Sequence, residues 1–188
     1  MVKIKIKEVT PGCMPEIIKV GDWIDLSTAE DYTFKCPHAK MLHKRKRGSD
    51  VPVERSRDVI FDYQLLSLGV VIEMPKGYEA MVLPRSSTFK KWGILLANSQ
   101  GVIDQQYCGP NDVWRFPALA TRNVLISKGT PIAQFRIQLS QKATWWQKLK
   151  WLFSSKVELV KVSEMPNANR GGIGTGSDKY RTQIITNH

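Results

Sequence analysis

Short runs of alternating hydrophobic and polar residues dominate the chain. The opening segment MVKIKIK alternates branched aliphatic residues with lysines, which is the period of an amphipathic strand. Turn sequences such as Pro75–Gly77 and Ser127–Gly129 separate the later runs. These runs are Ile17–Val20, Gln64–Met74, Tyr78–Val82, Val124–Ile126, Ile132–Leu139 and Val157–Val162. The pattern predicts an all-β sandwich or barrel.

One segment departs from the β pattern. Within Ala143–Ser155, ATWWQKLKWLFSS, the residues Trp145, Leu149 and Leu152 recur at helical spacing. The segment therefore predicts a short amphipathic helix. Its apolar face could contact a membrane surface or a partner, and we favour packing against another copy of the chain. No apolar run approaches the roughly 20 residues that a membrane-spanning helix needs.

Composition and charge refine this picture. The 188 residues, 42% hydrophobic and 24% charged, predict one soluble globular domain. The net charge of +11 is concentrated in Lys35–Arg57, with eight basic and two acidic residues, and in Gln141–Lys156, with four lysines and no acid. We interpret 35–57 and 141–156 as insertions. The first residues are not a signal peptide, and three irregularly spaced cysteines indicate reduced thiols in a cytoplasmic protein.

The segment PRSSTFKKWGILLANSQGVID, from Pro84 to Asp104, carries the candidate chemistry. Arg85 offers a forked donor for phosphate oxygens, and Ser86 and Ser87 add hydroxyl and backbone donors. A lone carboxylate at the end of a β-type run, as at Asp104, can serve as a general base for a water molecule.

The wording of this segment resembles motifs 2 and 3 of the trimeric dUTP diphosphatases (dUTPases). Segments similar to all five family motifs occur in family order, which is far more specific than any one motif. They are GDWIDLSTAED (Gly21–Asp31), PRSSTFKKWGI (Pro84–Ile94), NSQGVIDQQYCG (Asn98–Gly109), GTPIAQFRI (Gly129–Ile137) and NRGGIGTGS (Asn169–Ser177). The wording GDWIDL and the later NDVW are similar to the phage and prophage-like branch of Gram-positive bacteria.

The resemblance implies a fold, an activity and an assembly. The fold is a dUTPase-like jelly-roll β-barrel over residues 1–168, with a short inserted helix, followed by a Gly-rich C-terminal arm and tail over 169–188. The activity is hydrolysis of dUTP to dUMP and pyrophosphate, assisted by Mg²⁺. The assembly is a homotrimer whose sites combine motifs 1, 2 and 4 of one chain, motif 3 of a second and motif 5 of a third.

By the same resemblance, Asp104 activates the water that attacks the α-phosphate, and Gln134 contacts phosphate and that water. Asp25 organises water molecules around Mg²⁺, which binds mainly through substrate phosphates and keeps most of its waters. The remaining phosphate ligands of the core site are Arg85, Ser86 and Ser87.

Substrate selection is implied for motif 3. Asn98 reads uracil together with the backbone of the hairpin residues Gly101, Val102 and Ile103. The ring of Tyr107 lies under the deoxyribose and leaves no room for a 2′-hydroxyl.

The C-terminal arm departs from the family pattern. Arg170, Gly174 and Thr175 match residues that wrap the β- and γ-phosphates, but Ile173 stands where a Phe normally stacks on uracil. We consider Trp114 or Phe116 as substitutes for that aromatic lid, with core packing as the alternative for both.

Other readings are less favoured. A dCTP deaminase shares the fold and an RSS motif but needs a glutamate soon after the motif 3 glycine, and PNDVWRF follows Gly109. A phage regulatory protein of dUTPase fold could bind a protein partner through the basic insertions. Cys36, His38 and His43 could ligate zinc, but no fourth ligand is evident. The run Lys44–Arg47 is more typical of a solvated loop than of a nucleic-acid site, and we expect neither nucleic acid nor membrane as a partner.

Overall fold

Strands make up most of the regular secondary structure in the computed structural model. It describes residues 1–17, 22–45, 52–153 and 156–166, and at 41–45 and 52–58 the backbone alone. The strands and helices of these residues are β1 (Val2–Glu8), β2 (Glu16–Ile17), β3 (Ile24–Ser27), β4 (Tyr32–Phe34), β5 (His38–Arg45), β6 (Pro52–Ile60), β7 (Tyr63–Ser67), β8 (Val70–Glu73), β9 (Tyr78–Pro84), α1 (Thr88–Trp92), β10 (Ile94–Leu96), β11 (Gly101–Ile103), β12 (Arg115–Ala120), β13 (Val124–Ile126), β14 (Pro131–Leu139), α2 (Trp145–Phe153) and β15 (Val157–Lys161). The predicted all-β class is confirmed.

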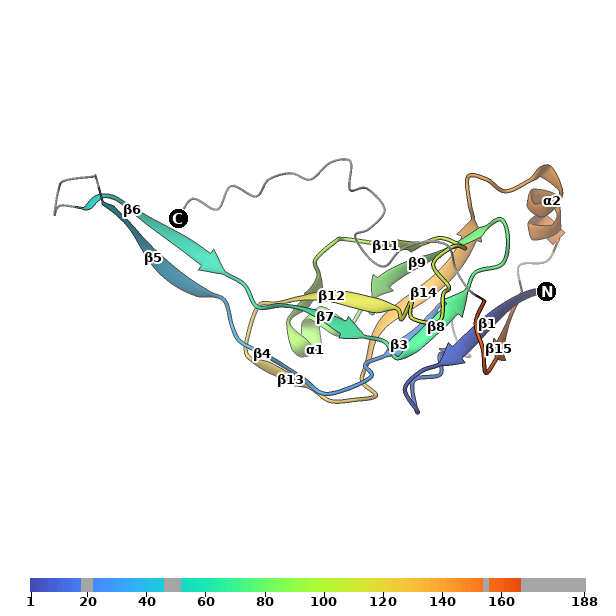
Figure 1. The fold of residues 1–188 in the computed structure, drawn as a ribbon, viewed down its shortest axis with the longest axis horizontal. Helices are drawn as coiled ribbons and strands as arrows, with labels where there is room; N and C mark the ends of the chain where they lie inside the picture. Colours follow the sequence, from blue (N-terminus) through green and yellow to red (C-terminus); the bar gives the residue numbers. More distant parts are fainter. Residues whose placement is uncertain (18–21, 46–51, 154–155, 167–188) are drawn as a thin grey trace.

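The strands form several small sheets around one core (Figure 1). The largest sheet has the order β11-β9-β14-β3-β2, and three-stranded sheets have the orders β15-β1-β8 and β10-β12-β7. Strands β4 and β13 pair with each other, as do β5 and β6. Pairing between strands distant in the sequence, such as β1 with β15, closes the body around the core.

The core takes one face of each amphipathic strand. In β1 the aliphatic residues Val2, Ile4 and Ile6 are buried, and the intervening Lys3 and Lys5 are exposed, as the alternation predicts. Aromatic side chains from the other sheets complete the core, among them Phe34, Trp114, Phe116 and Phe135.

The apolar pattern of Gln64–Met74 suggested one continuous strand, but the structure has two. The run is divided into β7, which pairs with β12, and β8, which pairs with β1. The division lies at Gly69, whose φ of +67° is in the left-handed region. Its carbonyl accepts hydrogen bonds from Val9 and Thr10, at 2.8 and 3.0 Å. These bonds hold the turn that passes the chain between two sheets.

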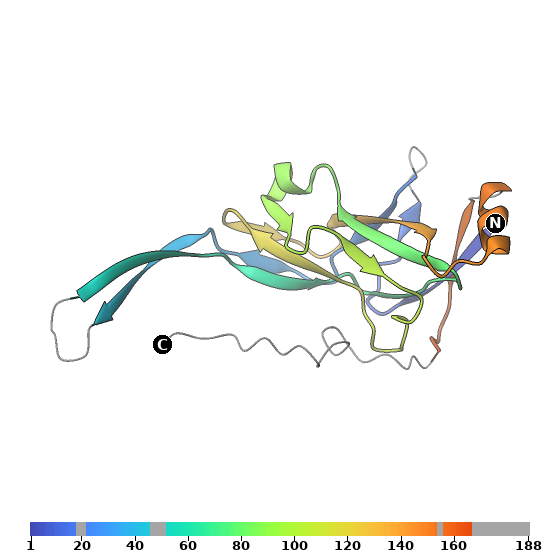
Figure 2. The ribbon, with the colours of Figure 1, turned by 90° about the horizontal axis from the view of Figure 1, so that it is seen from above.

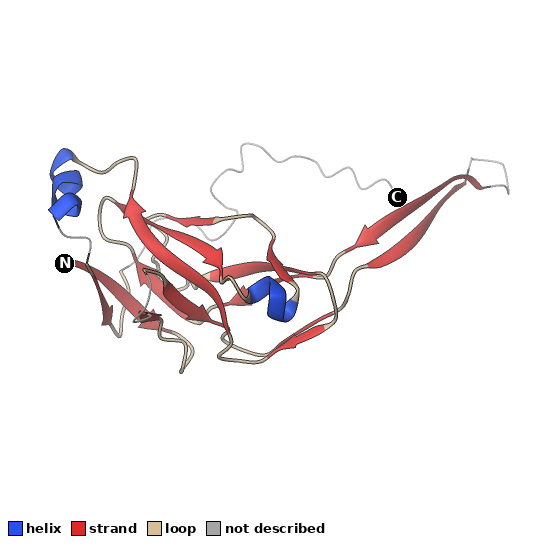
Figure 3. Ribbon diagram, turned by 180° about the vertical axis from the view of Figure 1, so that it is seen from behind, coloured by secondary structure: helices blue, strands red, loops and turns tan. Residues whose placement is uncertain are grey.

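A long hairpin that sequence reasoning did not predict overlaps the basic segment 35–57. Strands β5 and β6 pair only with each other among the described strands, in an antiparallel register from His38–Ile60 to Arg45–Pro52. The hairpin projects from the body at the end opposite α2 (Figures 2 and 3). Its polar, basic sequence lacks the strict alternation of a strand with one buried face.

The segment 141–156 contains the predicted helix, α2. The helix begins after Thr144, whose hydroxyl accepts a hydrogen bond from the Gln147 backbone at 3.3 Å. The Gln147 side chain accepts one in return from the Thr144 backbone at 2.7 Å, which completes a capping box. None of the helices in the described residues is sufficiently long and apolar to cross a membrane.

Gly69 provides a stability test with an internal control. A Cβ at Gly69 would lie 2.7 Å from the buried Cys13 sulfur, whereas a Cβ at Gly129 would meet nothing within 4 Å. Both glycines have positive φ. We expect Gly129→Ala to lose about 1–2 kcal/mol from backbone strain alone, and Gly69→Ala to lose about 3 kcal/mol or more because overpacking adds to it. Chemical denaturation measures both losses, and equal losses would show that the Gly69 turn can relax.

Candidate functional site

Strand β14 joins the predicted residues of motifs 1, 2 and 4. Gln134 lies opposite Asp25 on β3 and opposite Leu83 on β9. Its side-chain amide also donates a hydrogen bond to the carbonyl of Pro84 at 3.2 Å. Three segments that are distant in the sequence therefore place their polar side chains on one face of the largest sheet.

Arg85 completes this group, because it follows directly after β9. Its Nε atom lies 3.0 Å from Oδ1 of Asp25, and both side chains are largely shielded from solvent. The Arg85 backbone N–H donates to the carbonyl of Ile132 at 3.3 Å. Burial raises the pKa of Asp25, while the neighbouring Arg85 charge acts in the opposite direction. This group joins a partly desolvated acid to a cation.

The turn after Arg85 presents further donors. Thr88 fixes it: its backbone donates to the Arg85 carbonyl at 3.0 Å and its hydroxyl to the Ile132 carbonyl at 2.7 Å. Ser86 is exposed, and Ser87 precedes α1 without forming a side-chain capping bond. The two serines therefore lie beside Arg85 at the surface, as a phosphate-binding role requires.

Motif 3 forms the edge of the same sheet. Strand β11 pairs with β9 on one side, with Gly101 opposite Val82, and has no partner on its other side among the described strands. Asn98 is exposed in the turn before β11. An edge strand presents N–H and C=O groups in fixed positions. Among the described strands, the outer edge of Gly101–Ile103 therefore keeps backbone N–H and C=O groups available for a ligand.

A tight turn presents Asp104. Its Oδ1 accepts a hydrogen bond from the Gln106 backbone at 2.9 Å, and its carbonyl accepts one from the Tyr107 backbone at 3.3 Å. The Tyr107 ring is half-buried against the core, and its hydroxyl donates to the Val113 carbonyl at 3.3 Å. Burial raises the pKa of Tyr107, and Asp112 adds to the shift. The ring is therefore a rigid, neutral wall beside the acid.

Sequence reasoning missed Asp112. This carboxylate is buried and accepts a hydrogen bond from the Gly109 backbone at 2.8 Å. It closes the loop between Tyr107 and Val113, so it stabilises the carbonyl that holds the Tyr107 hydroxyl. The signal in the sequence was the turn-forming PND after Gly109.

The structure brings the predicted residues together in two groups. Ile103 lies opposite Ala80, near the start of β9, whereas Arg85 follows its end. At about 3.3 Å per residue, Asp104 and Arg85 are roughly 20 Å apart along β9. One chain therefore holds two partial sites, Asp25–Arg85–Gln134 and Asp104–Tyr107, at opposite ends of a strand.

The arm residues Arg170, Gly174 and Thr175, together with Ile173, lie outside the described residues. Trp114 and Phe116 are fully buried in the core, so neither can cover a substrate base as an aromatic lid. Of the two alternatives, core packing is therefore the correct one for both residues, and the lid is wrong.

The candidate zinc ligands belong to no metal-binding cluster among the described residues. The described residues contain no group of three or more His, Cys, Asp or Glu side chains that could hold a metal ion. Cys36 and His38 are exposed, and the His43 side chain lies outside the described part of the chain. The zinc hypothesis gains no support from the first two residues.

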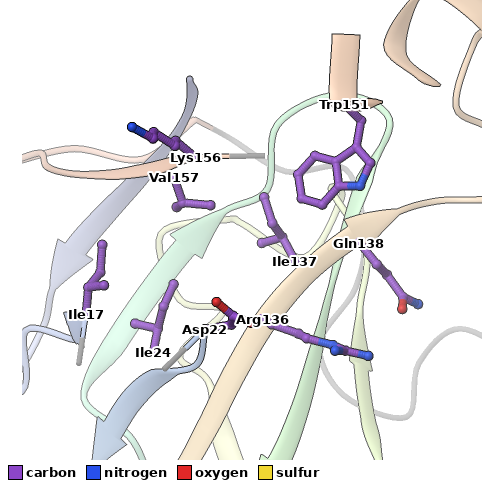
Figure 4. A pocket seen from close by; sticks show the side chains of 9 residues that line it. All are labelled: Ile17, Asp22, Ile24, Arg136, Ile137, Gln138, Trp151, Lys156 and Val157. Atoms are coloured by element: carbon purple, nitrogen blue, oxygen red, sulfur yellow. The ribbon is translucent and has the colours of Figure 1, made fainter. Parts of the chain in front are cut away.

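A cavity of about 520 Å³ lies elsewhere, between β14 and the start of β15 (Figure 4). It is lined by Ile17, Asp22, Ile24, Arg136, Ile137, Gln138, Trp151, Lys156 and Val157. No predicted site residue is among them. We therefore place the candidate active site at the two partial sites and not in this cavity.

Comparisons with known proteins point to one family. The dUTPase family model matches residues 48–144. The SPbeta prophage-derived deoxyuridine 5′-triphosphate nucleotidohydrolase YosS of Bacillus subtilis (strain 168) is 38% identical over 178 residues, covering 95% of this chain and 99% of that protein. The deoxyuridine 5′-triphosphate nucleotidohydrolase of Hydrogenobaculum sp. (strain Y04AAS1) is 37% identical over 117 residues. This match covers 62% of this chain and 71% of that protein.

Solved structures show the same fold. The dUTPase from Streptococcus mutans superposes with a TM-score of 0.53 at 20% identity, covering 71% of this chain and 90% of its own. A mutant dUTPase from phage phi11 of S. aureus, described with a structural Mg(II) ion, gives 0.54 at 14% identity, covering 75% and 93%. The jelly-roll expectation is confirmed by these likenesses.

The Asp25–Arg85 pair predicts a titration. Arg85→Ala should raise the pKa of Asp25 further, because the cost of burying the carboxylate would lose its counter-charge. The native state of the variant would then bind this proton still more tightly than its unfolded chain does. As pH rises through the Asp25 pKa, the free energy of unfolding should therefore fall by a larger amount in the variant than in the wild type. Carboxyl NMR titration measures the shift. Glu8, whose pKa is lowered chiefly by Lys161, is the internal control, and an unchanged Asp25 pKa would contradict the ion pair.

Proposed function

The chain belongs to the dUTPase family, and from that membership we propose that it hydrolyses dUTP to dUMP and pyrophosphate. The observation that carries the proposal is the grouping of Asp25, Arg85 and Gln134 from three distant segments. Each of the three matches a family motif, and strand pairing places them on one face without any role in the core.

The proposed reaction is an in-line displacement at the α-phosphorus. A bond forms between the water oxygen and that phosphorus, and the bond to the oxygen bridging to the β-phosphorus breaks. Asp104 accepts the proton of the attacking water, and Gln134 orients the water. Arg85 and the serine donors beside it stabilise the charge on the phosphate oxygens, which is where such reactions gain most of their rate.

The residues present fit a magnesium ion bound together with the substrate. Oδ1 of Asp25 is buried and has no partner besides Arg85 among the described residues. Mg²⁺ keeps several waters and needs few protein ligands. The shielded carboxylate of Asp25 alone can therefore order those waters. The ion would neutralise triphosphate charge, and a phage relative has a structural Mg(II).

The separation of the two partial sites supports an assembly of several copies, and the family resemblance implies that the assembly is a homotrimer. Asp104 lies roughly 20 Å along β9 from Arg85, too far for both to act on one phosphate within one chain. In a closed ring of identical chains, one copy's Asp104 can meet the next copy's Arg85. We therefore propose three equivalent sites at the interfaces between chains.

A regulatory role is a second candidate. The β5–β6 hairpin projects from the body, away from α2 (Figure 1), and its segment carries much of the positive charge. A solved phage 80alpha dUTPase is described in connection with control of virulence-gene transfer. Some phage dUTPases resemble switches that sequester a repressor, so a labelled phage repressor is the test partner. Deleting residues 38–60 should leave dUTP hydrolysis intact but abolish binding to it. Equal binding by the wild type and the deletion variant would exclude the hairpin as the binding surface.

Substrate specificity and the role of Asp104 test the main proposal together. With Mg²⁺, pyrophosphate release should be fast with dUTP and slow with dCTP, dTTP and UTP. Asp104→Asn should lower kcat by more than about 100-fold, because an amide cannot take the proton. It should still fold, since the Asn oxygen can accept the Gln106 hydrogen bond. A variant within about tenfold of wild type, near 1.4 kcal/mol in barrier, would exclude Asp104 as the base.

Tyr107 predicts how the sugar is read. Tyr107→Ala should raise kcat/KM for UTP relative to dUTP, because removing the ring relieves a clash with the 2′-hydroxyl only in UTP. Tyr107→Phe retains the ring and loses only the bond to Val113, so discrimination should survive. If both variants discriminate as well as wild type, the sugar is read elsewhere.

A further inference from the structure

Helix α2 points its apolar face away from the body. Trp145, Trp146, Leu152 and Phe153 retain 65, 72, 77 and 80% of their accessible surface. On the opposite side of the helix, Gln147 and Trp151 contact the body. This arrangement reverses the ordinary orientation of an amphipathic surface helix, whose apolar face packs on the core.

Specific contacts fix this orientation. The Gln147 amide donates to the Lys76 carbonyl at 2.7 Å and lies directly over Gly77, where a Cβ would overlap it. One turn later, Trp151 packs against Tyr78 with ring centroids 5.4 Å apart and lines the cavity (Figure 4). With these two anchors on one side, the helix cannot roll to bury its apolar face.

The lysines of α2 border its outward apolar face. Successive residues turn by about 100° around a helix, so Lys148 and Lys150 lie on opposite flanks, between the inward and outward faces. Both are exposed. Lys142 and Lys156 stand before and after the helix, and the segment 141–156 contains no acidic residue. The outward surface is thus an apolar strip with a positive border on both sides.

This surface matches an anionic lipid bilayer better than a second copy of the chain. Trp, Phe and Leu partition into the boundary between headgroups and acyl chains, while bordering lysines contact lipid phosphates. A symmetric contact between two copies would bring the four lysines of 141–156 close to the same four lysines of the other copy, and that segment has no acidic residue to pair with them. The outward orientation changes the preference that the sequence alone gave.

We propose that α2 is a peripheral membrane-binding element: its outward face, Trp145–Trp146–Leu152–Phe153, inserts into the surface of an anionic bilayer, and Lys148 and Lys150 bind the lipid phosphates. The proposal is independent of the catalytic assignment, because none of these residues belongs to either partial site.

Vesicle flotation with the full-length protein tests it. The protein should bind phosphatidylcholine vesicles containing about 30 mol% phosphatidylglycerol and not phosphatidylcholine alone, and added salt should weaken the binding. Leu152→Ser should reduce partitioning about tenfold, and Lys148→Gln with Lys150→Gln about thirtyfold.

Matched controls remove similar groups far from α2. Leu125→Ser replaces another leucine that is 60% exposed. Lys35→Gln with Lys40→Gln removes two exposed lysines, one just before the hairpin and one in its strand β5. These controls should bind vesicles as the wild type does. dUTP hydrolysis and light scattering check that every variant is folded and keeps its assembly state.

Three results would overturn the proposal. They are absence of vesicle binding, equal binding to neutral and anionic vesicles, and equal losses in the control variants. If Leu152→Ser dissociates the oligomer and the wild type ignores vesicles, the outward face is a contact between copies of the chain.

Discussion

The register of β14 between β3 and β9 determines the position of the candidate site. Antiparallel pairing on both edges sets Gln134 opposite Asp25 on one side and Leu83 on the other. Arg85 follows β9 directly and therefore meets Asp25 at 3.0 Å. A slip of one residue would turn Gln134 toward the core and Phe135 outward, since successive side chains alternate between faces. Core packing and site assembly thus depend on the same hydrogen bonds.

The same strand pairing explains why the site is divided. Strand β9 carries Arg85 at its end, while β11 runs antiparallel along its other edge toward the opposite end. The length of β9 then separates Asp104 from the phosphate-binding group. Oligomerisation is accordingly part of the proposed chemistry, because only another copy of the chain can bring the two groups together.

The sequence predicted the β class, α2 and the dUTPase family better than the path of the chain. Five motifs in order identified Asp25, Arg85 and Gln134, and the structure groups them. The turn at Gly69 was missed because it interrupts a continuous apolar run, and the β5–β6 hairpin because no buried face imposes alternation on it. The choice between lid and core for Trp114 stayed open, since burial is not visible in its local sequence. The outward face of α2 depends on Gln147 and Gly77, which meet only in three dimensions.

Mixing two inactive variants tests the divided site most directly. Asp104→Asn retains the Arg85 group, and Arg85→Ala retains Asp104. If each site takes these residues from different chains, trimers reassembled from equal amounts should have about one quarter of their sites intact and regain dUTP hydrolysis accordingly. If both residues serve one site within a single chain, every site carries a mutation, and the mixture should remain as inactive as either variant alone.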